Sequence, residues 1–529
     1  MWLNSQRLLL AVLYVLGSTR YIFSSAEPLA MRQAQLQRAW AEYLLNSNNS
    51  IDSKQNQNTA ESPVLRMAKL QSPAPHMAKQ RRQGGLYQDY YFDQKIDHFD
   101  LRGNETFKQK IYINGESYVP GGPIYLFNSG ETPASPSYLA AGEPYTLAKA
   151  TGGMLIIMEH RYYGVSYPVS DMSGPNMRYL TVENALEDIA HFARNAPAFV
   201  KKSVGLTIGP ENKWIATGGS YSGNLAVWLR KLYPDLFYAA YASSAPLLIS
   251  TNFYQYDQVV GRALPCAQNI SDAVLTLDAI LDSGDRSLVA SWKRAFGLDA
   301  LKSDFDFAGA LTDQLSNTVQ YYMPPAKGSN SPDAIDTLCS WFNRSYNIPL
   351  QNFADMTAAY IKNNGIDPVS AYSSASGANN IGLYQDGRSW YYQTCTQFGY
   401  WQAAPPGPLR RLRSKYVTKE WQSKPCQAFF GEDITGQPDV SALNRKLGGL
   451  FPNVTRVIFV NGLNDPWSEL SVASDPSVAA INMQYGENVV ITMSKASHVT
   501  DFYFSSSRTD FGVDIARKRI LAAIKTFLQ

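Results

Sequence analysis

The sequence predicts an α/β fold, a doubly wound sheet domain interrupted by a largely helical insertion. Short continuous apolar runs alternate with amphipathic helical patterns, which is typical of buried parallel strands covered by helices. The alternation stops near Pro246 and resumes near Arg456. One apolar run also leads through a glycine- and serine-rich turn directly into a helical pattern, an arrangement that α/β enzymes use to present a reactive side chain.

The N-terminus has the features of an export signal. Arg7 precedes the apolar run Leu8–Gly17, and small residues end at Ala26. This run is too short to span a bilayer, so we predict a signal peptide over residues 1–26, with an N-terminal anchor helix as the alternative. Residues 27–85 are rich in Gln, Asn, Ser and Ala and end in a basic cluster. We expect either a removable prosegment or an uncut disordered extension there.

The first folded residues should lie near Tyr90, and the strands and helices should follow in alternation. Val182–Phe199, Asn224–Tyr233 and Val513–Leu528 have helical periodicity. The predicted strands are Pro123–Phe127, Met154–Met158, Trp214–Thr217, Phe237–Ala242, Arg456–Val460 and Asn488–Met493.

The interruption divides the chain into a sheet domain, residues 86–246 and 450–529, and an insertion, residues 247–449. Ligands of open α/β sheets bind outside the carboxyl ends of the strands. An insertion between late strands would roof that crevice, so we expect a helical cap.

Composition excludes several classes of protein. Lys and Arg number 47 and Asp and Glu 44, giving a net charge of +3. This near-balance argues against a nucleic-acid partner, which would require a basic face. With 45% hydrophobic and 12% aromatic residues, the chain can bury a core and is not disordered as a whole.

The cysteines and sequons fit an exported protein. Four cysteines form an even set, as expected in an oxidising compartment, and pairing in sequence order is the simplest of the three arrangements. Neither Cys-x-x-Cys spacing nor a nearby His accompanies them, so we expect no metal and no cofactor. The cysteines are Cys266, Cys339, Cys395 and Cys426, and the sequons are at Asn48, Asn104, Asn269, Asn343 and Asn453.

The glycine-rich turn indicates a serine nucleophile. The strand ending at Thr217 continues as Gly-Gly-Ser-Tyr-Ser-Gly and enters a helix, which is the context of a nucleophile elbow. The Gly-x-Ser-x-Gly spacing fits better on Ser220 than on Ser222, although Ser222 replaces the second glycine. The alternative is that Ser220 only caps the helix.

The base and the acid are predicted from chain order. In α/β-hydrolases the nucleophile is followed by the acid and then by the histidine. Among five histidines, only His498 follows the last predicted strand. Asp465 follows the preceding strand in an Asn-Asp-Pro turn and could orient His498, or it could merely bond its own backbone.

An oxyanion hole requires two hydrogen-bond donors aimed at the developing charge. We expect one to be the N–H of Tyr221, which follows the nucleophile, and the other to come from the loop Asn128–Glu131. Gly130 would allow that loop to approach the substrate closely.

Several segments resemble the prolyl-specific serine peptidase family, which includes lysosomal Pro-X carboxypeptidase, dipeptidyl peptidase II, thymus-specific serine peptidase and fungal prolyl endopeptidases. The resemblance covers about residues 88 to 529. It implies an α/β-hydrolase fold with a helical cap, a Ser220–Asp465–His498 triad and cleavage after proline, with Trp467 in the proline pocket. It rests on YFDQKIDHF at 91–99, EHRYYG at 159–164, GGSYSG at 218–223 and NDPW at 464–467.

The expected function is therefore that of a secreted or lysosomal/vacuolar serine peptidase that acts on peptide substrates. It would form an acyl-enzyme and would not insert stably into membranes, and a homodimer is compatible with the sequence. Three alternatives remain: a serine carboxypeptidase without proline preference, a secreted esterase or lipase of the same fold, and an inactive binding homologue. Whether cleavage is internal or at a chain end does not follow from a triad.

Overall fold

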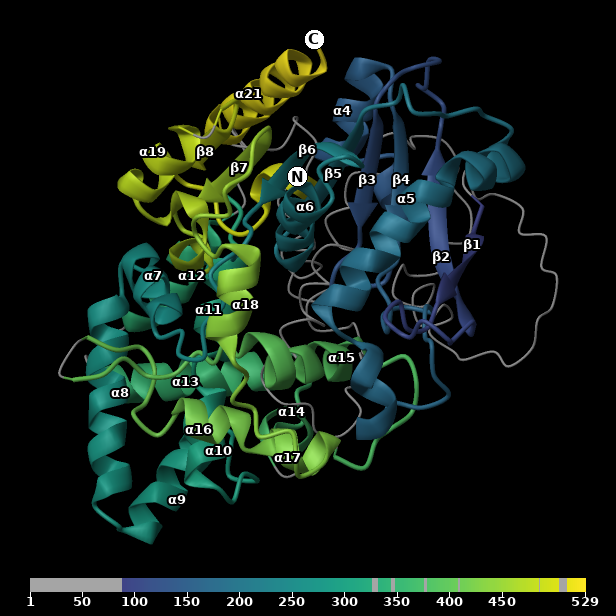
Figure 1. The fold of residues 1–529 in the computed structure, drawn as a ribbon. Coiled ribbons are helices and arrows are strands. Elements are labelled where there is room, and N and C mark those ends of the chain that lie inside the picture. The colour runs from purple at the N-terminus through teal and green to yellow at the C-terminus, as the bar shows by residue number, and fades with distance from the viewer. Residues whose placement is uncertain are drawn as a thin grey trace, which may run out of the picture.

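The computed structural model describes residues 88–325, 332–343, 348–374, 378–407, 410–484, 486–503 and 511–529. The predicted signal peptide, the segment 27–85 and the sequon at Asn48 lie outside these residues. Figure 1 shows a layered sheet domain in the upper half of the molecule and a helical cap below it. The chain has an α/β-hydrolase fold, with the cap inserted between two neighbouring strands.

Eight strands form one sheet in the order β1-β2-β4-β3-β5-β6-β7-β8. The six strands from β4 to β8 in this order pair in parallel, whereas β1 and β2 are antiparallel to their neighbours. The strands are β1 Tyr90–Lys95, β2 Thr106–Asn114, β3 Ile124–Asn128, β4 Met154–Met158, β5 Trp214–Gly219, β6 Phe237–Ser243, β7 Val457–Gly462 and β8 Val489–Met493.

Alternate side chains of the central strands enter two separate apolar layers. Leu126 and Ile156 pack with one cluster, and Tyr125 and Ile157 pack with the other. Helices α5 (Val182–Val204) and α6 (Tyr221–Leu232) cover the first face, and α4 (Glu143–Thr151) and α21 (Phe511–Leu528) cover the second. Burial on both faces explains why these strands are continuous apolar runs.

The predicted elements are present with small shifts at their ends. Helix α5 begins at Val182 as expected but continues to Val204, past the predicted end at Phe199. Gly205, in the left-handed conformation, ends it and donates its N–H to Lys201. The strands β5 and β7 extend into the glycines that follow them, because the parallel ladder continues through those residues.

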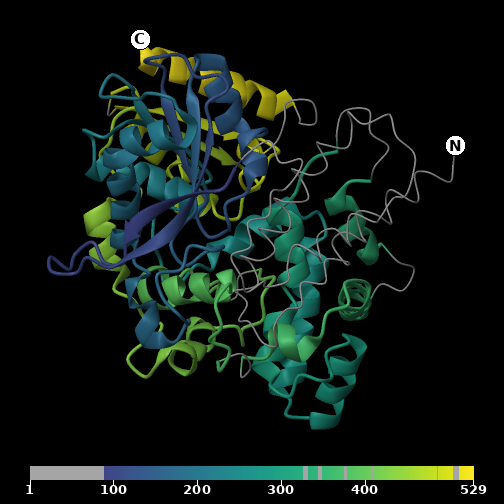
Figure 2. The same cartoon turned by 90° about the vertical axis from the view of Figure 1, so that its right-hand side faces the viewer.

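The cap occupies the chain between β6 and β7, and apart from one isolated bridge between Ser250 and Gly399 its described regular elements are helices (Figure 2). Two disulfides join its segments, Cys266 to Cys339 and Cys395 to Cys426, which is the pairing in sequence order. Its helices are α7 Gln255–Ala263, α8 Ala267–Asp282, α9 Arg286–Ala295, α10 Asp304–Ala310, α11 Asp313–Gln320, α12 Ala334–Cys339, α13 Pro349–Asn363, α14 Pro368–Tyr372, α15 Asp386–Gln393, α16 Lys419–Ser423, α17 Pro425–Phe430 and α18 Val440–Leu447.

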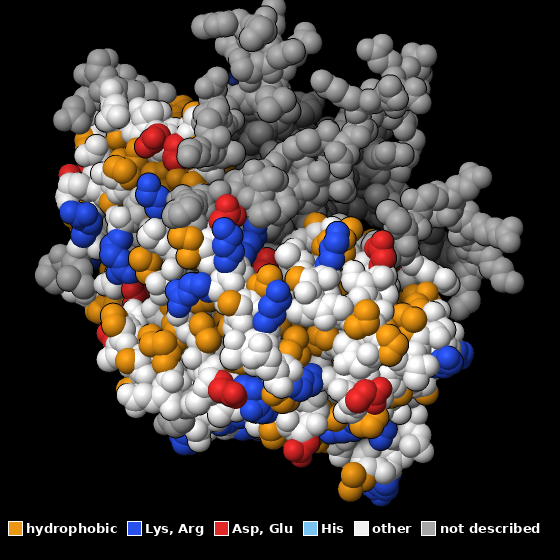
Figure 3. Space-filling model, turned by 90° about the horizontal axis from the view of Figure 1, so that it is seen from above, with side chains coloured by type: hydrophobic (Ala, Val, Ile, Leu, Met, Phe, Trp, Pro, Cys, Tyr) orange, Lys and Arg blue, Asp and Glu red, His pale blue; other side chains and the backbone are white. Residues whose placement is uncertain are grey.

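The remaining described α-helices, α19 (Pro476–Gln484) and α20 (Thr500–Tyr503), flank β8. Charged and apolar side chains are interspersed on the face shown in Figure 3, in keeping with the near-balance of charge. Among the described residues, none of the helices is long and apolar enough to cross a membrane. The sequon residues Asn104, Asn343 and Asn453 are exposed, and Asn269 is half-buried.

Candidate active site

Ser220 lies at the junction between β5 and α6 in a strained backbone conformation. Its φ of 58° and ψ of −132° are unusual for a residue with a side chain. Its N–H donates to the carbonyl of Ser243 on β6, which ties the turn to the sheet. Although Ser220 is at the N-cap of α6, its side chain makes no capping hydrogen bond. A helix cap therefore does not account for this serine.

Ser222 faces the other way. Its side chain is buried, and its hydroxyl donates to the backbone carbonyl of Asn128 at the end of β3. Gly218 makes this packing feasible, because a Cβ there would lie 2.1 Å from the carbonyl oxygen of Ser222. The geometry thus favours Ser220 over Ser222 as the residue that faces a substrate.

Asp465 and His498 form a buried pair at the ends of β7 and β8. Nδ1 of His498 lies 2.9 Å from Oδ1 of Asp465, and the same oxygen accepts the N–H of Trp467 at 2.9 Å. An Nδ1–H that donates to Asp465 leaves the Nε2 lone pair free, as a general base requires. Nε2 of His498 is buried and has no hydrogen-bond partner among the described residues.

The other described histidines occupy structural positions. His160 is buried beside Tyr221, and its Nδ1 lies 2.7 Å from the carbonyl of Arg161. It therefore donates from Nδ1 and accepts the Tyr221 hydroxyl proton at Nε2, over 3.0 Å. Burial lowers the pKa of His160 to about 4, so it is neutral except in strong acid. His98 pairs with Asp188, far from the triad in sequence and on the α5 side.

Tyr221 joins the elbow to the cap. Its backbone N–H opens helix α6, where the first N–H groups have no helical acceptor. Its hydroxyl accepts a hydrogen bond from Nε2 of Gln393 on α15, at 3.1 Å. The Gln393 side-chain oxygen accepts in turn from the hydroxyl of Tyr163, at 2.6 Å. The backbone of Tyr221 is thus held by helix α6, and its side chain is held by the cap through Gln393.

The loop after β3 approaches the elbow closely. Gly130 has a φ of 63°, and a Cβ on it would lie 3.0 Å from the Cβ of Ser222. The N–H of Gly130 donates to the Asn128 side chain at 3.0 Å, so this N–H is engaged within the loop. Gly130 allows the loop to approach the elbow closely, and its role as an oxyanion donor stays a prediction.

Glu131 lies beside Ser220 and His498, and the sequence analysis assigned it no role of its own. Its side chain is buried, and its carboxyl interacts with the hydroxyl of Ser220 and with His498. Burial raises the pKa of Glu131 to about 7, although its own backbone N–H, His498 and Ser220 partly oppose this. The only signal in the sequence was its place directly after Gly130. A neutral carboxyl at this position can donate a hydrogen bond beside the nucleophile.

The loop that carries Glu131 is supported from β4. Glu159 is buried and accepts the N–H of Ala134 at 2.9 Å and the N–H of Val165 at 2.8 Å. It also accepts the hydroxyl proton of Ser166. Glu159 therefore links the loop after β3 to the loop after β4, which explains why an acidic residue can be buried there.

A series of ring contacts links Tyr221, the residue after Ser220, to Trp467 beside His498. The ring of Tyr221 contacts Phe398 with centroids 5.3 Å apart, Phe398 stacks on Tyr400 at 5.6 Å, and Tyr400 contacts Trp467 at 5.3 Å. The Trp467 ring lies 6.3 Å from His498. We call these four residues the aromatic wall.

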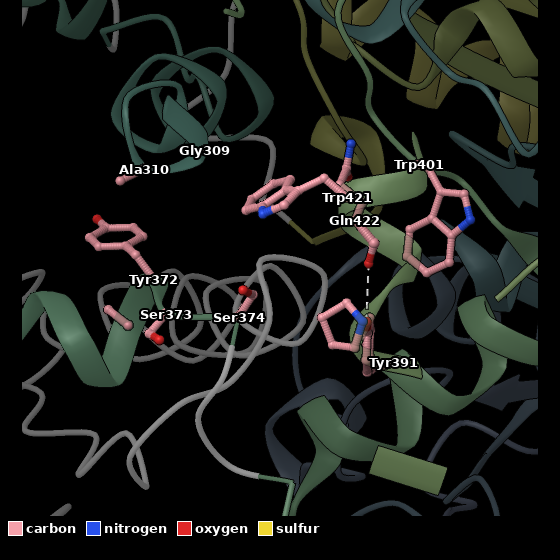
Figure 4. Close-up of a pocket in the computed structure, with 11 residues that line it drawn as sticks. Gly309, Ala310, Tyr372, Ser373, Ser374, Tyr391, Trp401, Trp421 and Gln422 are labelled. Carbon is pink, nitrogen blue, oxygen red and sulfur yellow. Dashed lines mark hydrogen bonds between the residues drawn. The ribbon is translucent and has the colours of Figure 1, made fainter. Parts of the chain in front are cut away.

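A separate cavity lies inside the cap (Figure 4). Tyr372 on α14 and Trp421 on α16 face it, and Tyr391 closes one side, where its hydroxyl donates to the carbonyl of Gln422 at 3.1 Å. Its lining does not include the triad residues. We therefore place the candidate active site at the strand ends and not in this cavity.

Known proteins match most of the chain. The serine carboxypeptidase S28 family matches residues 94–520. The thymus-specific serine protease of Mus musculus is 31% identical over 74% of this chain and 79% of its own. The corresponding human protein is 30% identical over 72% and 77%. A probable extracellular serine carboxypeptidase of Arthroderma benhamiae is 28% identical over 71% of this chain and 58% of its own.

Proposed function

The chain belongs to the serine carboxypeptidase S28 family, and from this premise we propose that it is an exported serine peptidase that cleaves after proline. That it is a serine-type peptidase follows from the family. The proline specificity, the compartment and the roles of individual residues are the parts that we propose here.

Ser220 Oγ attacks the scissile carbonyl, and Nε2 of His498 accepts its proton. Asp465 holds the imidazole in the required tautomer and stabilises the imidazolium that forms. The protonated His498 then gives its proton to the leaving amine, which leaves an acyl group on Ser220. Water enters, loses a proton to His498 and releases the acyl group as the carboxylic acid product.

The N–H of Tyr221 and the neutral carboxyl of Glu131 stabilise the negative oxygen of the tetrahedral intermediate. Because burial raises the pKa of Glu131 to about 7, the carboxyl carries its proton in acidic solution and can donate it in a hydrogen bond. Above that pH the carboxylate would oppose the developing charge. The arrangement therefore supports activity at acidic pH.

The observation that carries the proline assignment is the setting of Trp467. Its ring is buried, lies tilted at 40° beside His498, and is flanked by Phe253 and Tyr256. Proline presents a compact apolar ring and no N–H, so flat aromatic faces suit it and a polar partner is unnecessary. The resemblance of NDPW at 464–467 to the prolyl-specific peptidases points to the same role.

Export is supported by the two disulfides and by exposed sequon residues at Asn104, Asn343 and Asn453. We propose a secreted or lysosomal/vacuolar location. Tryptic mapping of the protein from its native source, with and without glycosidase, should find glycans at these sites. Unmodified asparagine at all of them would count against passage through the secretory pathway.

The decisive experiment compares two chromogenic peptides that differ only in proline or alanine before the scissile bond, with a short-chain ester beside them. A kcat/KM at least tenfold higher for proline supports the proposal. Equal rates would leave a serine peptidase without proline preference, and hydrolysis of the ester alone would favour an esterase. Peptides blocked at the N-terminus, the C-terminus or both would then identify the mode of cleavage.

A further inference from the structure

One residue of the cap contacts both the base and the predicted proline pocket. Gln320 is the last residue of α11, and it is buried. The last carbonyl groups of a helix have no acceptor role within it, so they are free to bind other groups. The carbonyl of Gln320 accepts the N–H of His498 at 3.1 Å, and the carbonyl of Val319 accepts the hydroxyl proton of Ser497.

The side chain of Gln320 is bonded at both of its polar atoms. Its Oε1 accepts Nε1–H of Trp467 at 3.1 Å and the hydroxyl proton of Tyr256 at 2.5 Å. Its Nε2 donates to the hydroxyl of Tyr321 at 2.8 Å. An amide is suited to this position, because one oxygen accepts two donors while the nitrogen fixes its rotation.

The two functions of Gln320 are chemically separable. The backbone carbonyl holds the loop that carries the base, and it survives any substitution. The side-chain oxygen holds the indole of Trp467, which is part of the aromatic wall. A substitution at this position should therefore change the pocket while leaving the triad in place.

We propose that Gln320 is a positioning residue for proline selectivity, acting through the indole N–H of Trp467. The proposal rests on the proposed function, because it assumes that Trp467 borders the proline pocket. Without the amide oxygen, the indole N–H and the Tyr256 hydroxyl lose their buried acceptor, and the ring can turn to seek another. The pocket then no longer presents one flat face.

The test measures the ratio of kcat/KM for the proline peptide to that for the alanine peptide. In Gln320→Leu this ratio should fall about tenfold, because two buried donors lose their acceptor. The rate at which Ser220 reacts with a small fluorophosphonate should change by less than about threefold, since the carbonyl that holds His498 remains. Gln320→Glu keeps an acceptor oxygen and should restore most of the ratio.

A matched control is Gln393→Leu. Gln393 is also a fully buried glutamine at the end of a cap helix, but its amide contacts Tyr221 and Tyr163. Its loss should lower hydrolysis of both peptides by the same factor. If Gln393→Leu lowers the proline ratio as much as Gln320→Leu does, the role of Gln320 is general packing and the proposal fails.

A double-mutant cycle makes the test independent of folding losses. Trp467→Phe keeps a ring but has no N–H, so adding Gln320→Leu to it should lower the ratio much less than in the wild type, because only the Tyr256 hydroxyl still loses its acceptor. A fall in that background as large as in the wild type would overturn the proposal. If the wild type itself shows no proline preference, the proposed function fails instead, and this outcome is seen before any variant is made.

Discussion

The sheet domain and the cap position the proposed active-site residues by different means. Ser220, Asp465 and His498 follow β5, β7 and β8, so parallel pairing brings their backbones to one edge of the sheet. Gln320 and Gln393 instead reach the site from the cap through side-chain hydrogen bonds. From this difference we expect the sheet to determine the chemistry and the cap to adjust which substrates reach the site.

The sharpest test on the sheet side is Ser220→Ala. It removes the nucleophile while the base and the oxyanion donors remain, so turnover of a peptide substrate should fall by about 10⁴ to 10⁶. Ser222→Ala should cost far less, because its hydroxyl donates to the Asn128 carbonyl and does not face the substrate. An inactive Ser222→Ala beside an active Ser220→Ala would mean that the elbow has been assigned to the wrong serine.

Asp465→Asn tests the acid on the same side. The amide would donate to Nδ1 of His498 where the carboxylate accepts, which favours the wrong tautomer. We expect kcat to fall about 10⁴-fold with little change in thermal stability. Measurement of kcat together with the melting temperature separates this outcome from unfolding, and a loss below about tenfold would return Asp465 to a turn-forming role.

Substitution of Glu131 should have an intermediate effect, smaller than that of the triad variants and larger than that of the cap variants. Glu131→Leu removes a donor beside Ser220 and should lower kcat by about 10²–10³ at acidic pH. Because burial raises the pKa of Glu131 to about 7, the wild-type kcat/KM should decline as pH rises through this value and the carboxyl ionises.

Glu131→Gln is the matched control for this charge. The amide keeps a donor and never ionises, so the decline near pH 7 should flatten while activity at acidic pH persists. A Gln variant with the same decline as the wild type would show that another group is responsible for it.

On the cap side, loss of a disulfide should affect stability more than chemistry. Substitution of both Cys395 and Cys426 by serine removes the disulfide that joins residues 31 positions apart. The protein should become less stable by about 3–4 kcal/mol. Fluorophosphonate labelling of Ser220 at a temperature where the variant is folded should proceed nearly as in the wild type. Loss of labelling in the folded variant would mean that the cap also fixes the triad.

The smallest expected effect is that of Trp467→Ala. Loss of a ring-sized apolar contact should weaken transition-state binding of the proline peptide by about 1–3 kcal/mol, which is measured as a fall in kcat/KM. The alanine peptide should lose less, because its methyl group contacts less of the Trp467 ring than proline does. Equal losses on both peptides would assign Trp467 to packing between the sheet and the cap.

The sequence predicted the sheet well because its signals are local. The strand Met154–Met158 has the predicted bounds, and the others shift by one or two residues. Strands β1 and β2 were not assigned: the edge strand β1 and the first half of β2 alternate buried and exposed residues, and the buried run of β2 covers only Ile111–Asn114. A pattern of alternation is a weaker signal than an apolar run.

The candidate site could be proposed from the sequence only where the backbone determines its position. Turn residues and chain order were sufficient to propose Ser220, Asp465 and His498. The proposed role of Glu131 depends on its burial, which raises its pKa. This burial cannot be inferred from the neighbouring residues in the sequence. Gln320 lies 147 positions from Trp467, and a contact of that kind follows from packing between two domains, not from any local pattern.

The insertion point of the cap also matters while the chain is being made. At about 5–20 residues per second, the roughly 210 residues between β6 and β7 take about 10–40 seconds to synthesise. The strand that bears the nucleophile is thus complete long before the acid and the base leave the ribosome. We therefore expect a chain that ends before β7 to be inactive, because it lacks both the proposed acid and the proposed base.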